Sequence, residues 1–170
     1  NEYLYEGATP FTNDLFSMKY QIFRPYDTKR TEFKLKESIG NVTVYKNTDK
    51  TALAYAMDDM VKTWDYQDYN PFYVQNDLAT SAFDVDELFH MIETEKPKLN
   101  NCKITSDNGD GEYVFENTSA QPDNMVFTIK SSKARQLYVH FDGSQVENTV
   151  IEKNGEQILT GRLDSQIIYL

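Results

Sequence analysis

Residues 102–117, CKITSDNGDGEYVFEN, decide the fold, because two runs of alternating polar and apolar residues flank a turn. The alternation has the period of two that is typical of half-buried strands, so we predict strands at 102–106 and 112–117. Between them, the glycines and short polar residues at 108–111 predict a hairpin turn. The same period continues to the end of the chain and predicts strands at 125–130, 136–141, 148–153, 157–160 and 166–170.

Upstream of this stretch the pattern also favours strands, at 20–23, 32–36, 42–45 and 51–57. The chain has 12 Tyr and 10 Phe residues, and aromatic residues are enriched in strands. Many short strands separated by turn residues indicate a β-sandwich or a jelly roll. We therefore predict a mainly β (α+β) fold, with residues 1–170 forming a single domain.

The middle of the chain, around residues 70–95, departs from the strand pattern and predicts a small helical insertion. Asn70 and Pro71 are residue types that cap and begin a helix, and apolar residues follow at helical spacing. Asp84, with Glu87 three residues later, has the pattern of a capping box. This pattern predicts a second helix that ends before Pro97.

Composition limits the classes of partner. The chain has 170 residues, of which 17 are basic and 27 acidic, a net charge of -10. This balance argues against nucleic acid and anionic lipid as partners, because both recruit basic surfaces. Cys102 is the single cysteine, so no disulfide can form within the chain. No apolar run approaches the ~18 residues of a membrane span. Because the chain starts at Asn1 and stops inside a predicted strand, we expect it to be an excised fragment.

An aromatic cluster lies between residues 64 and 75. Its members are Trp64, Tyr66, Tyr69, Phe72 and Tyr73, followed by the amide of Gln75. Aromatic rings that stack on sugar faces, with amides and carboxylates on the hydroxyl groups, are a physical basis of glycan recognition. The cluster is therefore the candidate glycan-binding surface. The alternative is that the rings attach the helical insertion to the sheets.

Motifs for catalysis or metal binding are weak in this sequence. His90 and His140 fall on different predicted elements, and single structural histidines are more common than a two-histidine metal site. The run 107–112 resembles the start of a calcium loop, which needs a glutamate at its twelfth position. Counted from Asp107, that position is Thr118, so a hairpin turn is favoured. Paired carboxylates such as Asp58 and Asp59 leave a surface glycoside hydrolase as a less favoured alternative. We expect no catalytic residue, no metal and no cofactor in this chain.

A further set of motifs occurs in a distinctive order. They are Lys46-Asn47, Leu53-Ala54-Tyr55, Trp64-Asp65, Asn70-Pro71-Phe72, Gln75-Asn76-Asp77-Leu78 and Glu87-Leu88-Phe89. This order resembles the C-terminal extracytoplasmic region of the YfhO family of bacterial multi-pass membrane proteins. Residues 14–20 look like the family's Lys-Tyr segment, and residues 137–139 and 168–170 resemble its late strands. One departure is at Ala52 and Ala54, where the family usually has Pro and Gly.

The resemblance implies a parent protein with many membrane helices, similar to lipid-linked glycosyltransferases and involved in glycosylating cell-wall polymers such as lipoteichoic acid. In such enzymes the catalytic acid lies in a loop between membrane helices, upstream of Asn1, so no catalytic residue carries over. We therefore expect a non-catalytic accessory domain on the extracytoplasmic face of the bacterial cell membrane. Its expected partners are the membrane-embedded part of the same protein and cell-wall glycan, and not nucleic acid. The alternative is a purely structural domain that packs on its own membrane helices.

Overall fold

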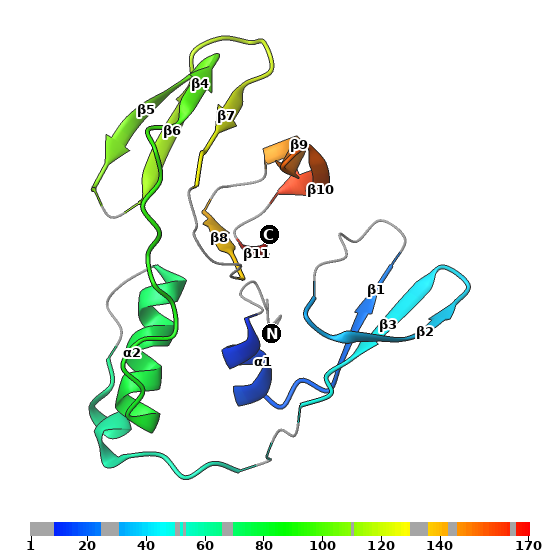
Figure 1. Cartoon of the computed structure of the whole chain (residues 1–170), viewed down its shortest axis with the longest axis vertical. Helices are drawn as coiled ribbons and strands as arrows, with labels where there is room; N and C mark the ends of the chain where they lie inside the picture. The colour runs from blue at the N-terminus through cyan, green and yellow to red at the C-terminus, as the bar shows by residue number, and fades with distance from the viewer. Residues whose placement is uncertain are drawn as a thin grey trace. The chain divides into compact units, whose positions relative to one another are not determined.

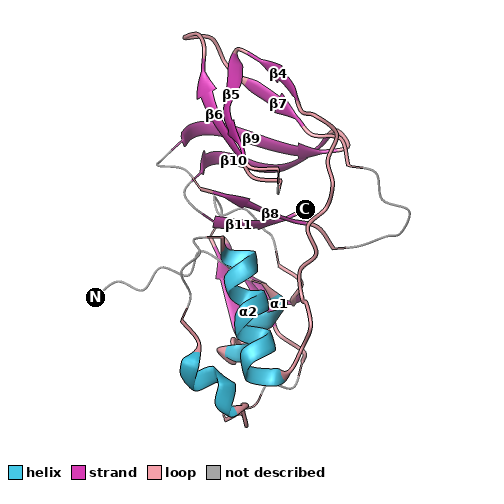
Figure 2. Cartoon of the chain, turned by 90° about the vertical axis from the view of Figure 1, so that its left-hand side faces the viewer, coloured by secondary structure: helices cyan, strands magenta, loops and turns pink. Residues whose placement is uncertain are grey.

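The computed structural model describes residues 9–24, 31–49, 52, 54–65, 70–109, 111–129, 136–142, 146–163 and 166–170. These residues form eleven strands, two α-helices and one 3₁₀-helix, which confirms the predicted mainly β class (Figures 1 and 2). The strands pair in one three-stranded and four two-stranded antiparallel sheets. The chain divides into two compact units, one of Asn1–Leu88 with Gln136–Leu170 and one of Phe89–Arg135.

The three-stranded sheet of the first unit has the order β1-β3-β2 (Figure 1). Its strands are β1 (Tyr20–Phe23), β2 (Lys34–Ile39) and β3 (Val42–Lys46). Gly40, with a φ of 57°, occupies the tight turn between β2 and β3, where a residue without Cβ avoids strain. A bulge between Leu35 and Glu37 shifts the register of β2 against β3. The structure confirms the prediction for β1, whereas β2 begins two residues later than predicted.

The helices of the first unit are α1 (Pro10–Leu15), η1 (Asp59–Thr63) and α2 (Pro71–Phe83). Helix α2 begins as predicted, because the Asn70 side chain accepts a hydrogen bond of 3.0 Å from the Phe72 amide and Pro71 occupies the first turn. Helix α1 was not predicted. Its N-terminus is a capping box in which the side chains of Thr9 and Thr12 each accept a bond from the other's backbone amide. Both helices thus start at side chains that satisfy otherwise unpaired amides.

The C-terminal part of the first unit contains two strand pairs. Strand β8 (Tyr138–Phe141) pairs with β11 (Gln166–Tyr169), and β9 (Val146–Lys153) pairs with β10 (Glu156–Leu163). Asn154 and Gly155 both have positive φ, 54° and 81°, as a primed two-residue hairpin turn requires. Leu159 and Ile168 form the centre of an apolar cluster, against which Phe141, Ile151 and Leu170 pack.

The second unit contains two further pairs, β4 (Lys98–Asn100) with β7 (Asn124–Val126) and β5 (Cys102–Asp107) with β6 (Tyr113–Asn117). The hairpin predicted between 102 and 117 is confirmed. Its turn includes a bond of 3.0 Å from the Gly109 amide to the Asp107 carboxylate. The rings of Tyr113, Phe115 and Phe127 contact one another, with centroids 5.6–6.0 Å apart.

The predicted second helix of the insertion is wrong. Residues 84–97 contain no helix, and Asp84 instead ends α2 in the left-handed conformation, with a φ of 55°. The chain then follows α2, because the Leu88 amide donates a 3.0 Å hydrogen bond to the Asn76 side chain. The hydroxyl of Thr80 lies 2.7 Å from the Val85 carbonyl and binds the same segment. These bonds replace those that a second helix would have formed.

The predicted strand at 51–57 is also wrong over its described residues, 52 and 54–57, which form no strand. Two of its residues, Tyr55 and Met57, are 39% and 41% exposed. The segment is attached by polar contacts instead. The Tyr55 hydroxyl donates to the Asp14 carbonyl at 2.6 Å, and the Ser17 hydroxyl donates to the Ala52 carbonyl at 2.6 Å.

Candidate functional site

The aromatic cluster spans the connection between η1 and α2. The Asp58 carboxylate caps η1 by accepting from the Met60 amide at 2.9 Å. The Asp58 amide donates to the Ala82 carbonyl at 2.9 Å, which attaches η1 to the C-terminal end of α2. Trp64 ends η1, and its amide donates to the Val61 carbonyl at 3.2 Å. The first turn of α2 begins at Pro71, seven residues after Trp64.

The six predicted site residues have different environments. Tyr66 and Tyr69 lie outside the described residues. The side chains of Trp64, Phe72 and Tyr73 are each partly buried. Gln75 is 6% exposed, so its amide faces the interior rather than solvent. Partial burial of the rings is compatible with both the binding and the packing interpretation, and their role in glycan binding stays a prediction.

Gln75 belongs to a buried group that we call the polar hub, formed by Thr9, Thr12, Asn13 and Gln75. The Thr9 hydroxyl donates to the Gln75 amide oxygen at 2.5 Å, and the Gln75 amide nitrogen donates to the Pro71 carbonyl at 3.0 Å. Thr9 and Asn13 are fully buried. Because an unpaired buried polar group costs free energy, these bonds fix α1 against α2 in one arrangement.

The polar hub also reaches the three-stranded sheet. The Asn13 amide nitrogen donates to the Glu32 carboxylate at 2.6 Å. On the other side, the Gln21 amide nitrogen of β1 lies 3.5 Å from the Asn13 amide oxygen. The hub thus joins α2, α1 and β1 through side-chain contacts. It positions the N-terminal turn of α2, where Phe72 and Tyr73 lie.

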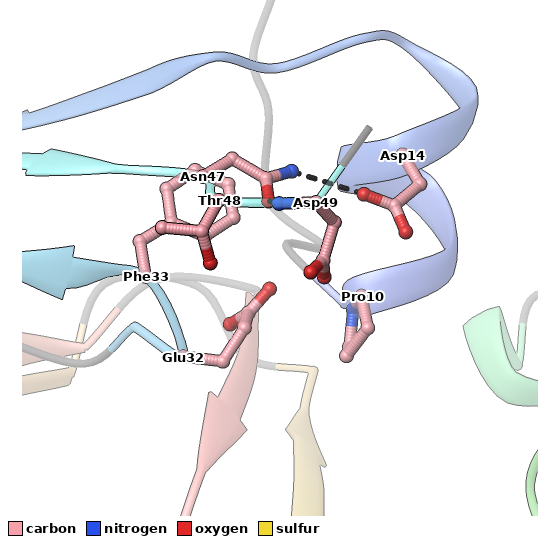
Figure 3. Close-up of a pocket in the computed structure, with 7 residues that line it drawn as sticks. All are labelled: Pro10, Asp14, Glu32, Phe33, Asn47, Thr48 and Asp49. Carbon is pink, nitrogen blue, oxygen red and sulfur yellow. Dashed lines mark hydrogen bonds between the residues drawn. The ribbon is translucent and has the colours of Figure 1, made fainter. Parts of the chain in front are cut away.

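A small pocket lies beside α1 (Figure 3), lined by Pro10, Asp14, Glu32, Phe33, Asn47, Thr48 and Asp49. Asn47 organises it, since its amide nitrogen donates to Asp14 at 3.0 Å and its oxygen accepts from the Asp49 amide at 2.9 Å. The cavity volume is about 30 Å³, which is room for water but not for a sugar ring. This pocket therefore gives no support to the glycoside hydrolase alternative, although three carboxylates line it.

No three His, Cys, Asp or Glu side chains come together as a metal-binding group within the part of the chain that the structure describes. His90 is exposed in the second unit, and His140 is partly buried on β8 in the first. Across the described ranges, none of the helices combines the length and the hydropathy needed to cross a bilayer.

Sequence reasoning missed the polar hub. A local signal existed for half of it, because Thr9, Pro10 and Thr12 together have the pattern of a capped helix start. No local signal connects Thr9 with Gln75, which lies 66 residues away. Sequence reasoning found Gln75 as an amide beside aromatic rings, and the structure gives that amide an internal partner.

Comparison with known proteins identifies a family that the chain matches. The family model described as "Bacterial membrane protein YfhO" matches residues 1–166, nearly the whole chain. No curated protein and no solved structure matches the chain.

Proposed function

We propose, since the chain belongs to the YfhO family of bacterial membrane proteins, that it is a non-catalytic accessory domain of a membrane glycosyltransferase-like protein. The domain lies on the extracytoplasmic face of the cell membrane, next to the membrane-embedded part of the same protein. The family match over residues 1–166 carries this proposal. The weak catalytic motifs of the sequence support an accessory role, and the small volume of the acidic pocket is consistent with it.

The proposed task is to position a cell-wall polymer, such as lipoteichoic acid, for glycosylation by the membrane-embedded part. The contact surface is the aromatic cluster, of which Trp64, Phe72 and Tyr73 are described. Two features support it. Capping by Asn70 and the Gln75–Thr9 bond hold the first turn of α2 in place, and ordered rings recognise sugars at a low entropic cost. The three rings also keep part of their surface open to solvent.

Fluorescence tests the glycan-binding part directly, because Trp64 is the single tryptophan of the chain. Titrating soluble cell-wall polymer fragments into the chain is expected to shift or quench its emission in a saturable way. Tyr73→Ala is expected to weaken the response, since it removes a ring from the same surface. The matched control is Val114→Ala, an exposed residue of the second unit, which leaves the response unchanged. No response to millimolar ligand would remove glycan binding from the proposal.

The second candidate function is a purely structural domain that packs on its own membrane helices. The burial of Gln75 favours it, because this amide pairs with Thr9 and Pro71 inside the fold and is not offered to a ligand. This role predicts that Tyr73→Ala lowers the amount of intact membrane protein in cells. The glycan-positioning role predicts instead an unchanged amount with lower glycosylation. Measuring both quantities in the same strain separates the two candidates.

A further inference from the structure

Basic residues are concentrated in one segment of this acidic chain. Residues 19–46 contain seven of the 17 basic residues and three of the 27 acidic ones, a net charge of +4. The rest of the chain therefore carries a net charge of -14. The positive segment includes all three strands of the sheet β1-β3-β2. The net charge of the whole chain hides this local excess.

The strand register shows which side chains share a face of that sheet. Residues directly opposite each other on antiparallel strands point to the same face. Tyr20 lies opposite Lys46, which lies opposite Lys34, and Ile22 lies opposite Val44. The opposite, inner face carries Gln21, which contacts the polar hub, and the paired rings of Phe23 and Tyr45.

The outer face exposes large apolar side chains. Ile22 and Ile39 are 65% and 62% exposed, and Tyr20 is 39% exposed. Isolated exposed apolar residues are common on proteins, but these three share one face of a single small sheet. An exposed apolar group of this kind, rimmed by charge, is typical of an interaction surface.

Lysines surround these apolar residues. The Lys36 ammonium lies 5.0 Å from the centroid of the Tyr20 ring, and the Lys19 ammonium lies 5.8 Å from it. Lys34 and Lys46 are directly opposed, an arrangement that destabilises a free sheet. We call this surface the lysine face, and its residues are Lys19, Tyr20, Ile22, Lys34, Lys36, Glu37, Ile39 and Lys46, with Glu37 directly opposite Val44.

Among the described residues, no ion pair involves a lysine of the lysine face, and its four lysines outnumber its single carboxylate, Glu37. Within the described part of the chain, the ion pairs involve Lys62 and Lys103, which lie elsewhere. The three strands contain one acidic residue, Glu37. The hydrogen bond from Lys36 and its charge, with smaller contributions from Lys19 and Lys46, lower the pKa of the Tyr20 hydroxyl from its ordinary value of 10.0.

We propose that the lysine face docks on the anionic phospholipid surface of the bilayer. Ammonium groups contact lipid phosphates while exposed isoleucines enter the boundary of the acyl chains, the combination that holds peripheral surfaces on membranes. An anionic surface would also relieve the repulsion between the opposed Lys34 and Lys46. The acidic remainder of the chain is repelled by the same surface, so the lysine face is the part of the chain that we expect to approach it. The chain belongs to a family of membrane proteins, and this proposal rests on the proposed function for the position of the domain next to the bilayer.

Vesicle co-sedimentation of the 170-residue chain tests this proposal. Binding is expected to vesicles of phosphatidylcholine mixed equally with phosphatidylglycerol, and to weaken as salt is added. Binding to vesicles of phosphatidylcholine alone is expected to be much weaker. The variant Lys34→Gln/Lys46→Gln is expected to bind the anionic vesicles about 25-fold less well, at about fivefold for each lysine. Its fold is retained, because the change removes a repulsive pair.

Two matched variants separate this face from general charge effects. Lys98→Gln/Lys153→Gln makes the same change of net charge at exposed lysines of β4 and β9, and it should bind nearly as well as the unmodified chain. Ile22→Thr keeps a β-branched residue but removes apolar surface. It should weaken binding about tenfold while leaving the salt dependence unchanged.

Several outcomes would overturn the proposal. They are no binding to the anionic vesicles, equal binding to both vesicle types, or equal losses in the two lysine pairs. Sedimentation velocity of the chain without vesicles tests a further outcome that would overturn the proposal. A concentration-dependent dimer that Ile22→Thr abolishes would assign the face to a second copy of the chain instead of lipid.

Discussion

The polar hub and the lysine face lie on opposite sides of one three-stranded sheet, and each reverses the usual distribution of residues. Inside, Thr9 and Asn13 are polar and fully buried. Outside, Ile22 and Ile39 are apolar and more than 60% exposed. A chain that needed only stability would place these residue types the other way round. The contrast shows that the two regions meet different requirements.

In the hub, buried polar groups are satisfied by specific partners, so they determine one arrangement of α1, α2 and β1. Such a network contributes little net free energy but penalises alternative arrangements strongly. On the lysine face, the exposed isoleucines gain little free energy on folding, because water still reaches them. Their apolar surface remains available for binding. The hub therefore serves the fold, and the lysine face serves an interaction.

The largest expected effect comes from removing one partner in the hub. Thr9→Val and Gln75→Leu should each lower the free energy of unfolding by about 2–3 kcal/mol, because each leaves a buried polar group without its partner. The double variant should lose about 1–2 kcal/mol less than the sum of the two losses. Urea denaturation of the four proteins measures these differences.

The control for the hub is Thr63→Val, which removes an exposed hydroxyl that donates to the Met60 carbonyl at 2.9 Å. It should change the free energy of unfolding by about 0.5 kcal/mol or less. Additive losses for Thr9 and Gln75 would show that the two side chains do not act together.

Two tyrosines extend the comparison to alkaline pH. Burial, with the charge of Glu32 and the neighbouring Tyr169, raises the pKa of Tyr138. The folded state therefore retains a proton above pH 10.0 that the unfolded chain releases, and stability falls as the pH rises beyond that value. The slope is at most about 1.4 kcal/mol per pH unit, and smaller because the ring is partly solvated.

Tyr138→Phe should flatten this fall. Tyr20→Phe should instead remove a gain in stability that builds up as the pH rises toward 10.0, because the lowered pKa of Tyr20 favours its ionised form in the folded state. Urea titrations at several pH values above neutrality compare the three proteins. Parallel curves of stability against pH for all three proteins would contradict the contrast between the partly buried Tyr138 and the exposed Tyr20.

A smaller effect is expected at the start of α2. Asn70→Ala removes the cap that accepts from the Phe72 amide and should cost about 1 kcal/mol, whereas Asn70→Asp should retain most of the stability. Trp64 emission should change in the alanine variant if α2 positions the aromatic cluster. Equal stability of the two variants would argue against a capping role for Asn70.

The smallest effect on folding is expected on the lysine face. Ile22→Thr should alter the free energy of unfolding by about 0.5 kcal/mol or less, because the side chain is 65% exposed. In the polar hub, by contrast, replacing the polar side chain of Thr9 or Gln75 should lower the free energy of unfolding strongly. On the lysine face, replacing the apolar side chain of Ile22 should not. A loss above 2 kcal/mol would mean that Ile22 is part of the core.

Local patterns predicted the elements that local forces determine. Period-two alternation located β1 and the hairpin β5–β6, and the Asn70-Pro71 pair located the start of α2, because capping and alternation act within a few residues. The second helix failed because Asp84 adopts the left-handed conformation and Asn76 binds the Leu88 amide. A capping-box pattern predicts that Asp84 starts a new helix. It does not show that the same residue can instead end the preceding helix α2.

The sites were harder to predict than the strands. The cluster of aromatic residues indicated a candidate binding surface, but it did not reveal that Gln75 faces inward toward Thr9. The lysine face requires the strand register, since Lys34 and Lys46 are twelve residues apart in sequence and directly opposite in the sheet. The charge of residues 19–46 was a usable signal, although an argument from the net charge of -10 pointed away from it.

Lysine acetylation of the chain, free and bound to anionic vesicles, tests the central contrast most directly. The account predicts that Lys19, Lys34, Lys36 and Lys46 react more slowly with vesicles present, while Lys98 and Lys153 react at unchanged rates. Equal rates at all six lysines, or protection confined to Lys98 and Lys153, would contradict it.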